Sequence, residues 1–256
     1  MTSQSDVTSK LRGMIEGLAT SPMTLMEVCG THTHAIFANG IRALLPKTIK
    51  IISGPGCPVC VTSQSDVDRM IWLASQKNVV ICTFGDMIKV PGKGGSLAVA
   101  RSMGSDIRVM YSPFDVIEWA RQEKGKEFVL VGVGFETTTP GFAATIKQSK
   151  SLGIKNLSMF SLNKTVPEAL RALAQSGEVK LDGLILPGHV SAIIGLGPYE
   201  FLAKEFGVPG VVTGFEGFDI LSGLAVLVKL IAEKRPAIVN TYTRSVRPDG
   251  NPTAMS

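Results

Sequence analysis

The chain has 256 residues, a formal net charge of +5, 45% hydrophobic residues and only 18% charged residues. These values exclude a disordered or solvating chain and allow one large or two small hydrophobic cores. Because the lysines and arginines are scattered rather than clustered, we expect no nucleic-acid partner.

The predicted elements begin with a helix and continue as short apolar runs that alternate with helical patterns. Apolar residues between Leu11 and Leu18 recur at helical spacing, which predicts an amphipathic helix over residues 6–20. The apolar runs are bounded by turn residues, as is typical of strands buried on both faces. These runs are 25–28, 49–52, 79–82, 107–110, 128–133, 157–160, 184–186 and 211–212.

Helical patterns separate most of these predicted strands. Ser63 and Asp66 have the spacing of a helix cap, so we predict a helix over 63–76. Further helices are predicted over 113–123 and 167–176, each with a proline in its first turn, and over 218–234. The chain therefore reads as a series of strand–helix units.

Such a series is typical of two α/β architectures. One is a (β/α)8 barrel, for which the length is ordinary. The other is a pair of similar doubly wound, Rossmann-like domains with parallel sheets. The charged stretch 121–127 lies midway and predicts a boundary between residues 1–125 and 126–256. A short internal echo, Gly-Phe-Glu at 134–136 and again at 214–216, also favours two similar halves.

Unusual polar residues follow the predicted strands, and both architectures place ligand sites at the carboxyl ends of their strands. We therefore expect these residues to converge on one site or on two facing sites. They are Cys29 and His32 after the first strand, Cys57 and Cys60 after the second, Glu136 after the fifth and His189 after the seventh.

The cysteines indicate thiol or metal chemistry. All four precede residue 83, which does not suit a disulfide framework and fits a reducing compartment better. Residues 1–10 are polar, and no stretch approaches the roughly 18 uninterrupted apolar residues of a membrane span. We expect a cytoplasmic protein without a membrane partner, in which Cys82, inside an apolar run, is a core residue.

The sequence leaves alternatives open for Cys29, His32, Cys57 and Cys60. Cys29 and His32 are spaced like a chelating pair, and a helix starting there would favour the Cys29 thiolate. With Cys57 and Cys60 they formally make a Cys3His zinc set. A redox dithiol beside a third thiol that binds a softer metal is the favoured interpretation. The simplest alternative is that Cys29 is a small buried hydrophobe.

Glu136 and His189 each have a functional and a structural interpretation. Glu136 lies in a threonine-rich helix start, where it could accept a proton or orient a hydrogen bond, or where the threonines could merely cap the helix. A phosphate site is disfavoured because the glycine spacing is wrong and the carboxylate would repel phosphate. The position of His189 at a strand end favours a functional role over a satisfied loop histidine.

Four motifs together resemble the HypD family of hydrogenase maturation factors, in the right order and over essentially the whole chain. They are Met-Glu-Val-Cys-Gly-Thr-His at 26–32, Gly-Pro-Gly-Cys-Pro-Val-Cys at 54–60, Gly-Phe-Glu-Thr-Thr-Thr-Pro at 134–140 and Pro-Gly-His-Val-Ser at 187–191. The resemblance implies a cytoplasmic scaffold that assembles and carries the Fe(CN)2CO unit of [NiFe]-hydrogenase. It implies a HypC chaperone as partner, HypE as cyanide donor, two similar α/β domains, and ligand-transfer chemistry rather than ordinary turnover.

The resemblance also implies residue roles. Cys29 would ligate the iron together with a cysteine of the HypC partner, and Cys57 and Cys60 would be the redox pair. The remaining candidates, which would line the iron site or assist ligand transfer, are His32, Glu136 and His189.

One feature departs from the family. Its members continue into a C-terminal segment whose cysteines hold a [4Fe-4S] cluster, whereas this sequence has no cysteine after Cys82. The ligands of that cluster are absent, and the sequence indicates a fragment, a C-terminally truncated member or a degenerate relative of the family. Two alternatives from other classes are a zinc-stapled binding module and a thiol–disulfide oxidoreductase.

Overall fold

The computed structural model describes residues 4–256, which form two compact units. Unit 1 combines Met1–Cys57 with Val166–Ser256, and unit 2 is Pro58–Thr165. This division differs from the predicted boundary at residues 125 and 126. The reason is strand pairing, because the first strand of the chain pairs with a strand that begins at Gly183 and not only with its neighbour in sequence.

Unit 1 contains a five-stranded parallel sheet with the order β2-β1-β7-β8-β9. The order runs one way from β1 to β2 and the other way from β7 to β9, so β1 and β7 flank the point where it reverses. In open parallel sheets this switch point is where ligands bind. The strands are β1 (Met23–Glu27), β2 (Ile49–Ser53), β7 (Gly183–Pro187), β8 (Gly210–Thr213) and β9 (Ile238–Asn240).

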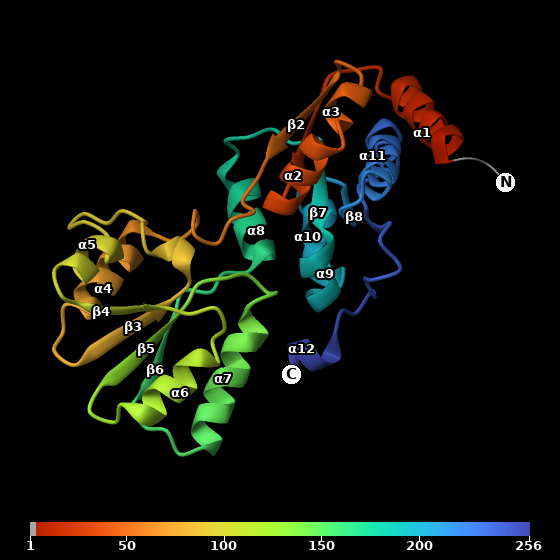
Figure 1. Ribbon diagram of the computed structural model, residues 1–256. Coiled ribbons are helices and arrows are strands. Elements are labelled where there is room, and N and C mark those ends of the chain that lie inside the picture. The colour runs from red at the N-terminus through yellow and green to blue at the C-terminus, as the bar shows by residue number, and fades with distance from the viewer. Residues whose placement is uncertain (1–3) are drawn as a thin grey trace. The chain divides into compact units, whose positions relative to one another are not determined.

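Helices cover both faces of this sheet. On one face, Ile15 of α1 and Leu224 of α11 pack in the same cluster as Leu25 of β1, and Figure 1 shows α1 beside α11. On the other face, Leu170 of α8 and Leu202 of α10 line a 130 Å³ cavity. The helices are α1 (Gln4–Leu18), α2 (Gly30–Ala38), α3 (Ile41–Leu44), α8 (Val166–Ser176), α9 (Gly188–Ile194), α10 (Glu200–Lys204), α11 (Gly217–Ala232), α12 (Pro252–Met255) and the 3-10 turn η2 (Gly197–Tyr199).

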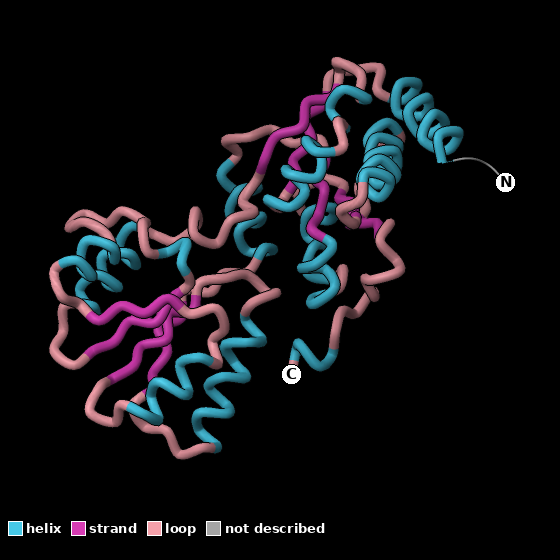
Figure 2. Tube along the Cα trace, viewed as in Figure 1, coloured by secondary structure: helices cyan, strands magenta, loops and turns pink. Residues whose placement is uncertain are grey.

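Unit 2 contains a four-stranded parallel sheet with the order β4-β3-β5-β6. Its switch point lies between β3 and β5. Figure 2 shows these strands side by side with helices on both sides. The elements are α4 (Gln64–Ala74), β3 (Val79–Thr83), the 3-10 turn η1 (Gly85–Met87), α5 (Leu97–Ser102), β4 (Asp106–Val109), α6 (Asp115–Gln122), β5 (Glu127–Gly132), α7 (Thr139–Ser151) and β6 (Leu157–Ser161).

The alternation of side chains along β3 explains the two cores of unit 2. Ile81 packs with residues of α4 and α5, whereas Val80 and Cys82 pack with residues of α6 and α7. Because each strand is covered on both faces, the strands read in the sequence as continuous apolar runs. The helix pairs lie on opposite sides of the sheet in Figure 1.

The structure confirms the prediction of two doubly wound sheets, and no closed barrel forms from the described strands. All predicted strands are present within a residue or two of their expected ends. The strand β9 was not predicted, because it is short and only half-buried. The Gly-Phe-Glu echo is not a structural repeat, since it follows the third strand of unit 2 and the fourth strand of unit 1. Among residues 4–256, the helices lack the length and apolar character needed to cross a bilayer.

Candidate functional site

Cys29 caps the amino end of α2, two residues after the end of β1. Its backbone is extended, with φ −167° and ψ 129°, so its side chain turns back over the first turn of the helix. There Sγ accepts the backbone N–H of Thr31 at 3.3 Å. The predicted helix start is therefore present, and Cys29 takes the position that serine, threonine or aspartate usually occupies.

His189 is the side chain that faces this sulfur. Its Nε2 lies 3.9 Å and its Nδ1 4.0 Å from Cys29 Sγ. The two residues meet because β1 and β7 are neighbours, with Glu27 in register with Ile185, so their carboxyl ends open at the same place. Gly188 lets the end of β7 lie close to the end of β8, since a Cβ there would lie 2.5 Å from the carbonyl oxygen of Thr213.

The surroundings of Cys29 favour its thiolate. Burial by itself raises the pKa of the thiol, but the hydrogen bond with His189 and the backbone amide of His32 outweigh it, so the pKa is lowered below its ordinary value. Cys82 is the opposite case, because burial raises its pKa to about 12. A thiolate is the form of cysteine that binds metals and attacks electrophiles, so Cys29 is suited to such chemistry and Cys82 is not.

His32 points away from the sulfur that its sequence spacing suggested as a chelating partner. Its side chain is fully buried and donates from Nε2 to the carbonyl oxygen of Gly214 at 3.0 Å. Its ring stacks on Phe215 with centroids 4.7 Å apart, and Phe215 also packs against His189 at 5.3 Å. Burial lowers the pKa of His32 to about 4, so the imidazole is neutral near pH 7.

The second ring nitrogen of His32, Nδ1, is buried and carries an unshared lone pair. Because the carbonyl of Gly214 can only accept, the proton lies on Nε2 and Nδ1 is unprotonated. Within the described chain Nδ1 has no hydrogen-bond partner. Such groups are rare in native proteins because they are costly, and they concentrate at functional positions. His32 is therefore placed as a neutral, aromatic wall of the site with one unused acceptor.

The loop that carries the cysteine pair packs on Cys29 through its glycines. Gly54 donates its N–H to the carbonyl oxygen of Glu27 at 2.8 Å, which continues the pairing of β2 with β1. A Cβ on Gly56 would lie 2.7 Å from Cys29 Cα, so only glycine fits. Cys57 follows directly and is half-buried, which brings the start of the pair next to the Cys29 cap.

The boundary between the two units falls inside the cysteine pair. Cys57 is the last residue of the first segment of unit 1, and Cys60 lies in unit 2, where it is exposed. Val59 packs against the core cluster of unit 2 that contains Val131 and Val133. The two thiols are thus attached to different units through the residues beside them.

Glu136 lies in unit 2, in the loop between β5 and α7. It is 8% exposed and follows the switch point of that sheet. Thr83, at the end of β3 on the other side of the same switch point, has a buried hydroxyl without a hydrogen-bond partner among residues 4–256. Thr138 is the N-cap residue of α7, but its side chain makes no capping hydrogen bond, so the expected capping by a threonine side chain is not seen. The hydroxyls of Thr138 and Thr139 instead donate to the carbonyl oxygen of Phe135.

The described chain does not assemble a metal site from its own side chains. Among residues 4–256, no three His, Cys, Asp or Glu side chains form a group that could hold a metal ion. The Cys3His zinc interpretation therefore gains no support. The cysteines do not fit a [4Fe-4S] cluster either, because Cys82 is fully enclosed in the core of unit 2. Cys29 by itself can offer a single thiolate ligand.

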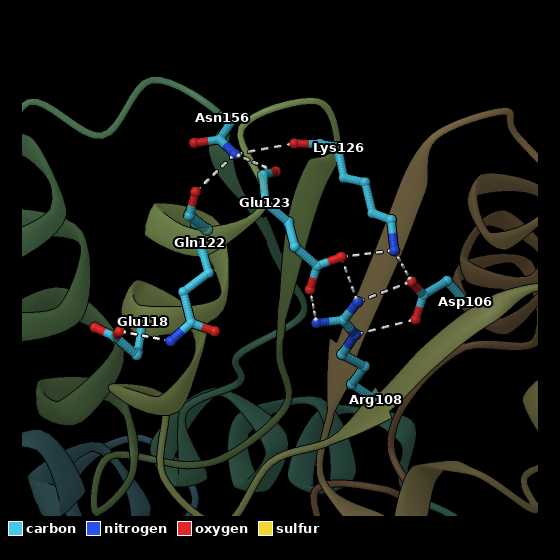
Figure 3. A network of polar contacts seen from close by, with 8 residues as sticks. Asp106, Arg108, Glu118, Gln122, Glu123, Lys126 and Asn156 are labelled. Atoms are coloured by element: carbon cyan, nitrogen blue, oxygen red, sulfur yellow. Dashed lines mark hydrogen bonds and ion pairs between the residues drawn. The ribbon is translucent and has the colours of Figure 1, made fainter.

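A different polar region lies at the amino ends of the strands of unit 2. Figure 3 shows Arg108 between Asp106 and Glu123, with Lys126 bonded to both carboxylates. A groove of 790 Å³ opens beside Asp106 and Lys126. Its position is the opposite end of the sheet from Glu136, so this network belongs to the support of the sheet rather than to the predicted site.

Two residues of the site were not predicted as such. Glu27 is 1% exposed and accepts the backbone N–H of Cys29 at 3.0 Å. Phe215 lies between His32 and His189. A carboxylate at the end of an apolar run was a usable signal for Glu27, whereas Phe215 was hidden because an aromatic residue after a strand is ordinarily core.

Comparison with known proteins gives a consistent result. The family model HypD, described as the hydrogenase formation hypA family, matches residues 5–256. The hydrogenase maturation factor HypD of Rhodobacter capsulatus is 45% identical over 248 residues, which are 97% of this chain and 66% of that protein. The HypD of Escherichia coli K12 is 42% identical over 91% of this chain and 62% of its own length.

An archaeal relative extends this range. A putative hydrogenase expression/formation protein of Methanocaldococcus jannaschii is 40% identical over 91% of this chain and 64% of its own length. The chain thus spans between 62% and 66% of the length of these three relatives.

Proposed function

The chain belongs to the HypD family of hydrogenase maturation proteins, and from this premise we propose that it is a scaffold on which the Fe(CN)2CO unit of [NiFe]-hydrogenase is assembled and carried. The iron unit is cargo, and Cys29 is its ligand from this chain. The observation that carries the proposal is the environment of Cys29, a helix-capping thiol with a lowered pKa at a switch point and 3.9 Å from His189.

The residues around Cys29 have distinct tasks in this proposal. Cys29 loses its thiol proton when the sulfur binds iron, and the imidazole of His189 is close enough to accept it. The neutral ring of His32 packs on Phe215, and Phe215 packs on His189, so these rings support the imidazole that faces the sulfur. Because Cys29 is a single ligand, a second ligand must come from a partner, and we propose a cysteine of a HypC-type chaperone.

The cysteine pair is proposed as the redox element. A dithiol and a disulfide of Cys57 and Cys60 differ by two electrons and two protons, and this is the couple that the sequence spacing permits. We propose that cyanide arrives from a HypE-type donor and that Glu136 assists ligand transfer by accepting or orienting a proton. The position of Gly56 against the Cys29 backbone supports a link between the pair and the iron site.

A test of this function compares two cysteine variants. The protein is purified without oxygen together with a HypC-type partner, and the infrared spectrum of the complex is recorded. We expect bands of bound cyanide and carbon monoxide, and about equal amounts of iron and complex. Cys29→Ala should lose the bands and the iron, because in this proposal Cys29 is the ligand of the iron unit and Cys57 and Cys60 serve as the redox pair.

The matched control is Cys82→Ala, which removes a cysteine from the core of unit 2. Its complex should keep both the bands and the iron. Bands that survive in Cys29→Ala would refute the role of Cys29. Stoichiometric zinc in the native protein, with unfolding on chelation, would favour the zinc module instead. Reduction of protein disulfides by iron-free protein would favour the oxidoreductase.

A further inference from the structure

Glu27 is the most deeply buried carboxylate at the site, and the roles above do not use it. It ends β1 and is 1% exposed. Its Oε2 accepts the backbone N–H of Cys29 at 3.0 Å, and its Oε1 accepts the hydroxyl of Thr33. Both donors are uncharged groups. A carboxylate buried against neutral donors is costly, which indicates that this side chain serves the site rather than the core.

The two hydrogen bonds fasten the first turn of α2 to the end of β1. One holds the N–H of the capping residue, Cys29, and the other holds Thr33, one helical turn later. The hydroxyl and the N–H of Thr33 also lie 3.3 and 3.0 Å from the carbonyl oxygen of Cys29. The carboxylate thus bonds to Cys29 and to Thr33, the two ends of the first turn of α2, over which Sγ folds. Its negative charge is favourable at the amino end of a helix.

The backbone of Glu27 makes a third connection. Its carbonyl oxygen accepts the N–H of Gly54 at 2.8 Å, at the start of the loop that leads to Cys57. Glu27 is therefore the residue where the strand, the Cys29 cap and the cysteine loop are joined. A substitution of the Glu27 side chain should disturb the Cys29 cap before it disturbs the cysteine loop. The bond between the Gly54 N–H and the Glu27 carbonyl oxygen does not depend on that side chain.

We propose that Glu27 is a positioning residue for Cys29. Its carboxylate holds Cys29 in the extended capping conformation in which Sγ accepts the amide of Thr31 and faces His189. The inference rests on the proposed function, in which this sulfur binds the iron cargo. Without the carboxylate, the N–H of Cys29 loses its acceptor, the turn opens locally, and the sulfur no longer has one fixed position.

Four variants of the full chain separate this role from general stability. Glu27→Ala removes both hydrogen bonds. Glu27→Gln keeps them without charge, because the amide oxygen can accept from Cys29 and the amide N–H can donate to the Thr33 hydroxyl. Thr33→Val keeps the shape of the side chain and removes the hydroxyl's bonds to Glu27 Oε1 and to the carbonyl oxygen of Cys29, while the bond from the Cys29 N–H to Glu27 remains. The control is Asp182→Ala, since Asp182 Oδ2 accepts the N–H of Thr24 at 2.7 Å, at the other end of the same strand.

The first measurement is amide hydrogen exchange, which needs no iron and no partner. In Glu27→Ala the amides of Cys29 and Thr31 should exchange at least about tenfold faster than in the native chain, because local opening is easier. Thr33→Val should show a smaller acceleration at the same amides. Glu27→Gln and Asp182→Ala should leave them within about twofold of the native rates.

The second measurement is the infrared spectrum of the anaerobic complex with the HypC-type partner. The cyanide and carbon monoxide bands should be weakest in Glu27→Ala, intermediate in Thr33→Val and native-like in Glu27→Gln. Rescue by glutamine distinguishes positioning through hydrogen bonds from a requirement for charge. If Glu27→Ala fails to fold, Thr33→Val and Glu27→Gln can still be compared. The bands of Thr33→Val should then be weaker than those of Glu27→Gln.

The outcomes decide between the claims. Native exchange rates in Glu27→Ala, or a glutamine variant as impaired as the alanine variant, would overturn the positioning role. Equal acceleration in Asp182→Ala would overturn it too, because the effect would then belong to the strand. If exchange follows the expected order but the native complex holds no iron, the proposed function fails while the positioning of Cys29 stands.

Discussion

The two units share one strand order over four strands, but the buried cluster around Glu27 and His32 in unit 1 and the ion-pair network around Arg108 in unit 2 lie at opposite ends of their sheets. The order β2-β1-β7-β8 in unit 1 matches β4-β3-β5-β6 in unit 2, with the reversal in the middle of each. In unit 1 the buried ionisable side chains gather at the carboxyl ends, around Glu27 and His32. In unit 2 the ion pairs around Arg108 gather at the amino ends, and they are partly exposed (Figure 3).

This difference shows that topology selects the switch point of a sheet. It does not decide how much burial of ionisable groups at each end of the sheet lowers the stability of the unit. The groups of unit 1 are cut off from water, so they lower stability unless every bond is made. The ion pairs of unit 2 keep contact with water and lose little on folding.

The largest effect should come from acid. Burial lowers the pKa of His32 from 6.5 to about 4, so between these values the unfolded chain binds a proton that the folded chain refuses. The free energy of unfolding of unit 1 should therefore fall as the pH falls from 6.5 to 4, by about 3 kcal/mol. Hydrogen exchange of α11 peptides, followed over this range, measures the loss.

Unit 2 should behave differently over the same range. The hydrogen bond with Arg108 lowers the pKa of Glu123 from 4.5 to about 2, so its contribution is complete above pH 4.5 and is lost below. Both tryptophans, Trp72 and Trp119, lie in unit 2, so their fluorescence reports its unfolding. In His32→Gln the acid sensitivity of unit 1 should disappear. A loss in unit 2 between pH 6.5 and 4.5 would break the contrast.

An intermediate effect should follow from Gly56→Ala. The added Cβ meets the Cys29 backbone at 2.7 Å, and backbone cannot move aside as a flexible side chain can. We expect a loss of about 2 kcal/mol in the free energy of unfolding of unit 1, together with faster exchange at the Cys29 cap. Urea unfolding followed by circular dichroism and exchange measures both.

The matched control is Gly94→Ala, in a loop of unit 2. No atom lies within 4 Å of a Cβ built there, among the residues that the structure covers. This variant should stay within about 0.5 kcal/mol of the native protein. Equal effects of the two substitutions would mean that the approach of the cysteine loop to Cys29 is not tight.

The smallest effect should come from the ion-pair network. Arg108→Met leaves Asp106 and Glu123 with Lys126 alone and should lower the free energy of unfolding of unit 2 by about 1 kcal/mol. High salt should reduce the difference in the free energy of unfolding between the native chain and Arg108→Met, because salt screens partly exposed ion pairs. Tryptophan fluorescence during urea unfolding measures the change.

The control for the network is Arg121→Met in α6 of the same unit. Its ion pair with Glu118 is long, at 3.5 Å, and more than half exposed on both sides. A change below about 0.5 kcal/mol is expected. A loss for Arg108→Met as large as that for Gly56→Ala would show that the charges of unit 2 matter as much as the buried site of unit 1.

Local patterns in the sequence were sufficient for the strands β1 to β8 and for the helices α1, α4, α6, α8 and α11. The runs at 79–82 and 128–133 became β3 and β5 because residues buried on both faces must be continuously apolar. The capping pair Ser63 and Asp66 opens α4, with Ser63 Oγ accepting the N–H of Asp66 at 3.2 Å. The edge strand β9 carried no comparable signal, because a half-buried strand need not be apolar throughout.

The division into units could not be read in the same way. The charged stretch 121–127 looked like a linker, but Glu123 pairs with Arg108, and Lys126 pairs with Glu123 and Asp106. The actual crossings fall at Cys57 and Val166. They follow from the insertion of β7 beside β1, a pairing of residues about 160 positions apart that no local pattern encodes.

The sequence by itself determined the family and the strand–helix alternation, and it supplied the candidate residues for the site. The tertiary structure alone decided which of them meet. It set His189 rather than His32 against the Cys29 sulfur, turned His32 onto Phe215, and buried Glu27 beneath the cap. The physical reason is that spacing fixes only neighbours along the chain, whereas the reversal of strand order between β1 and β7 brings distant strand ends together.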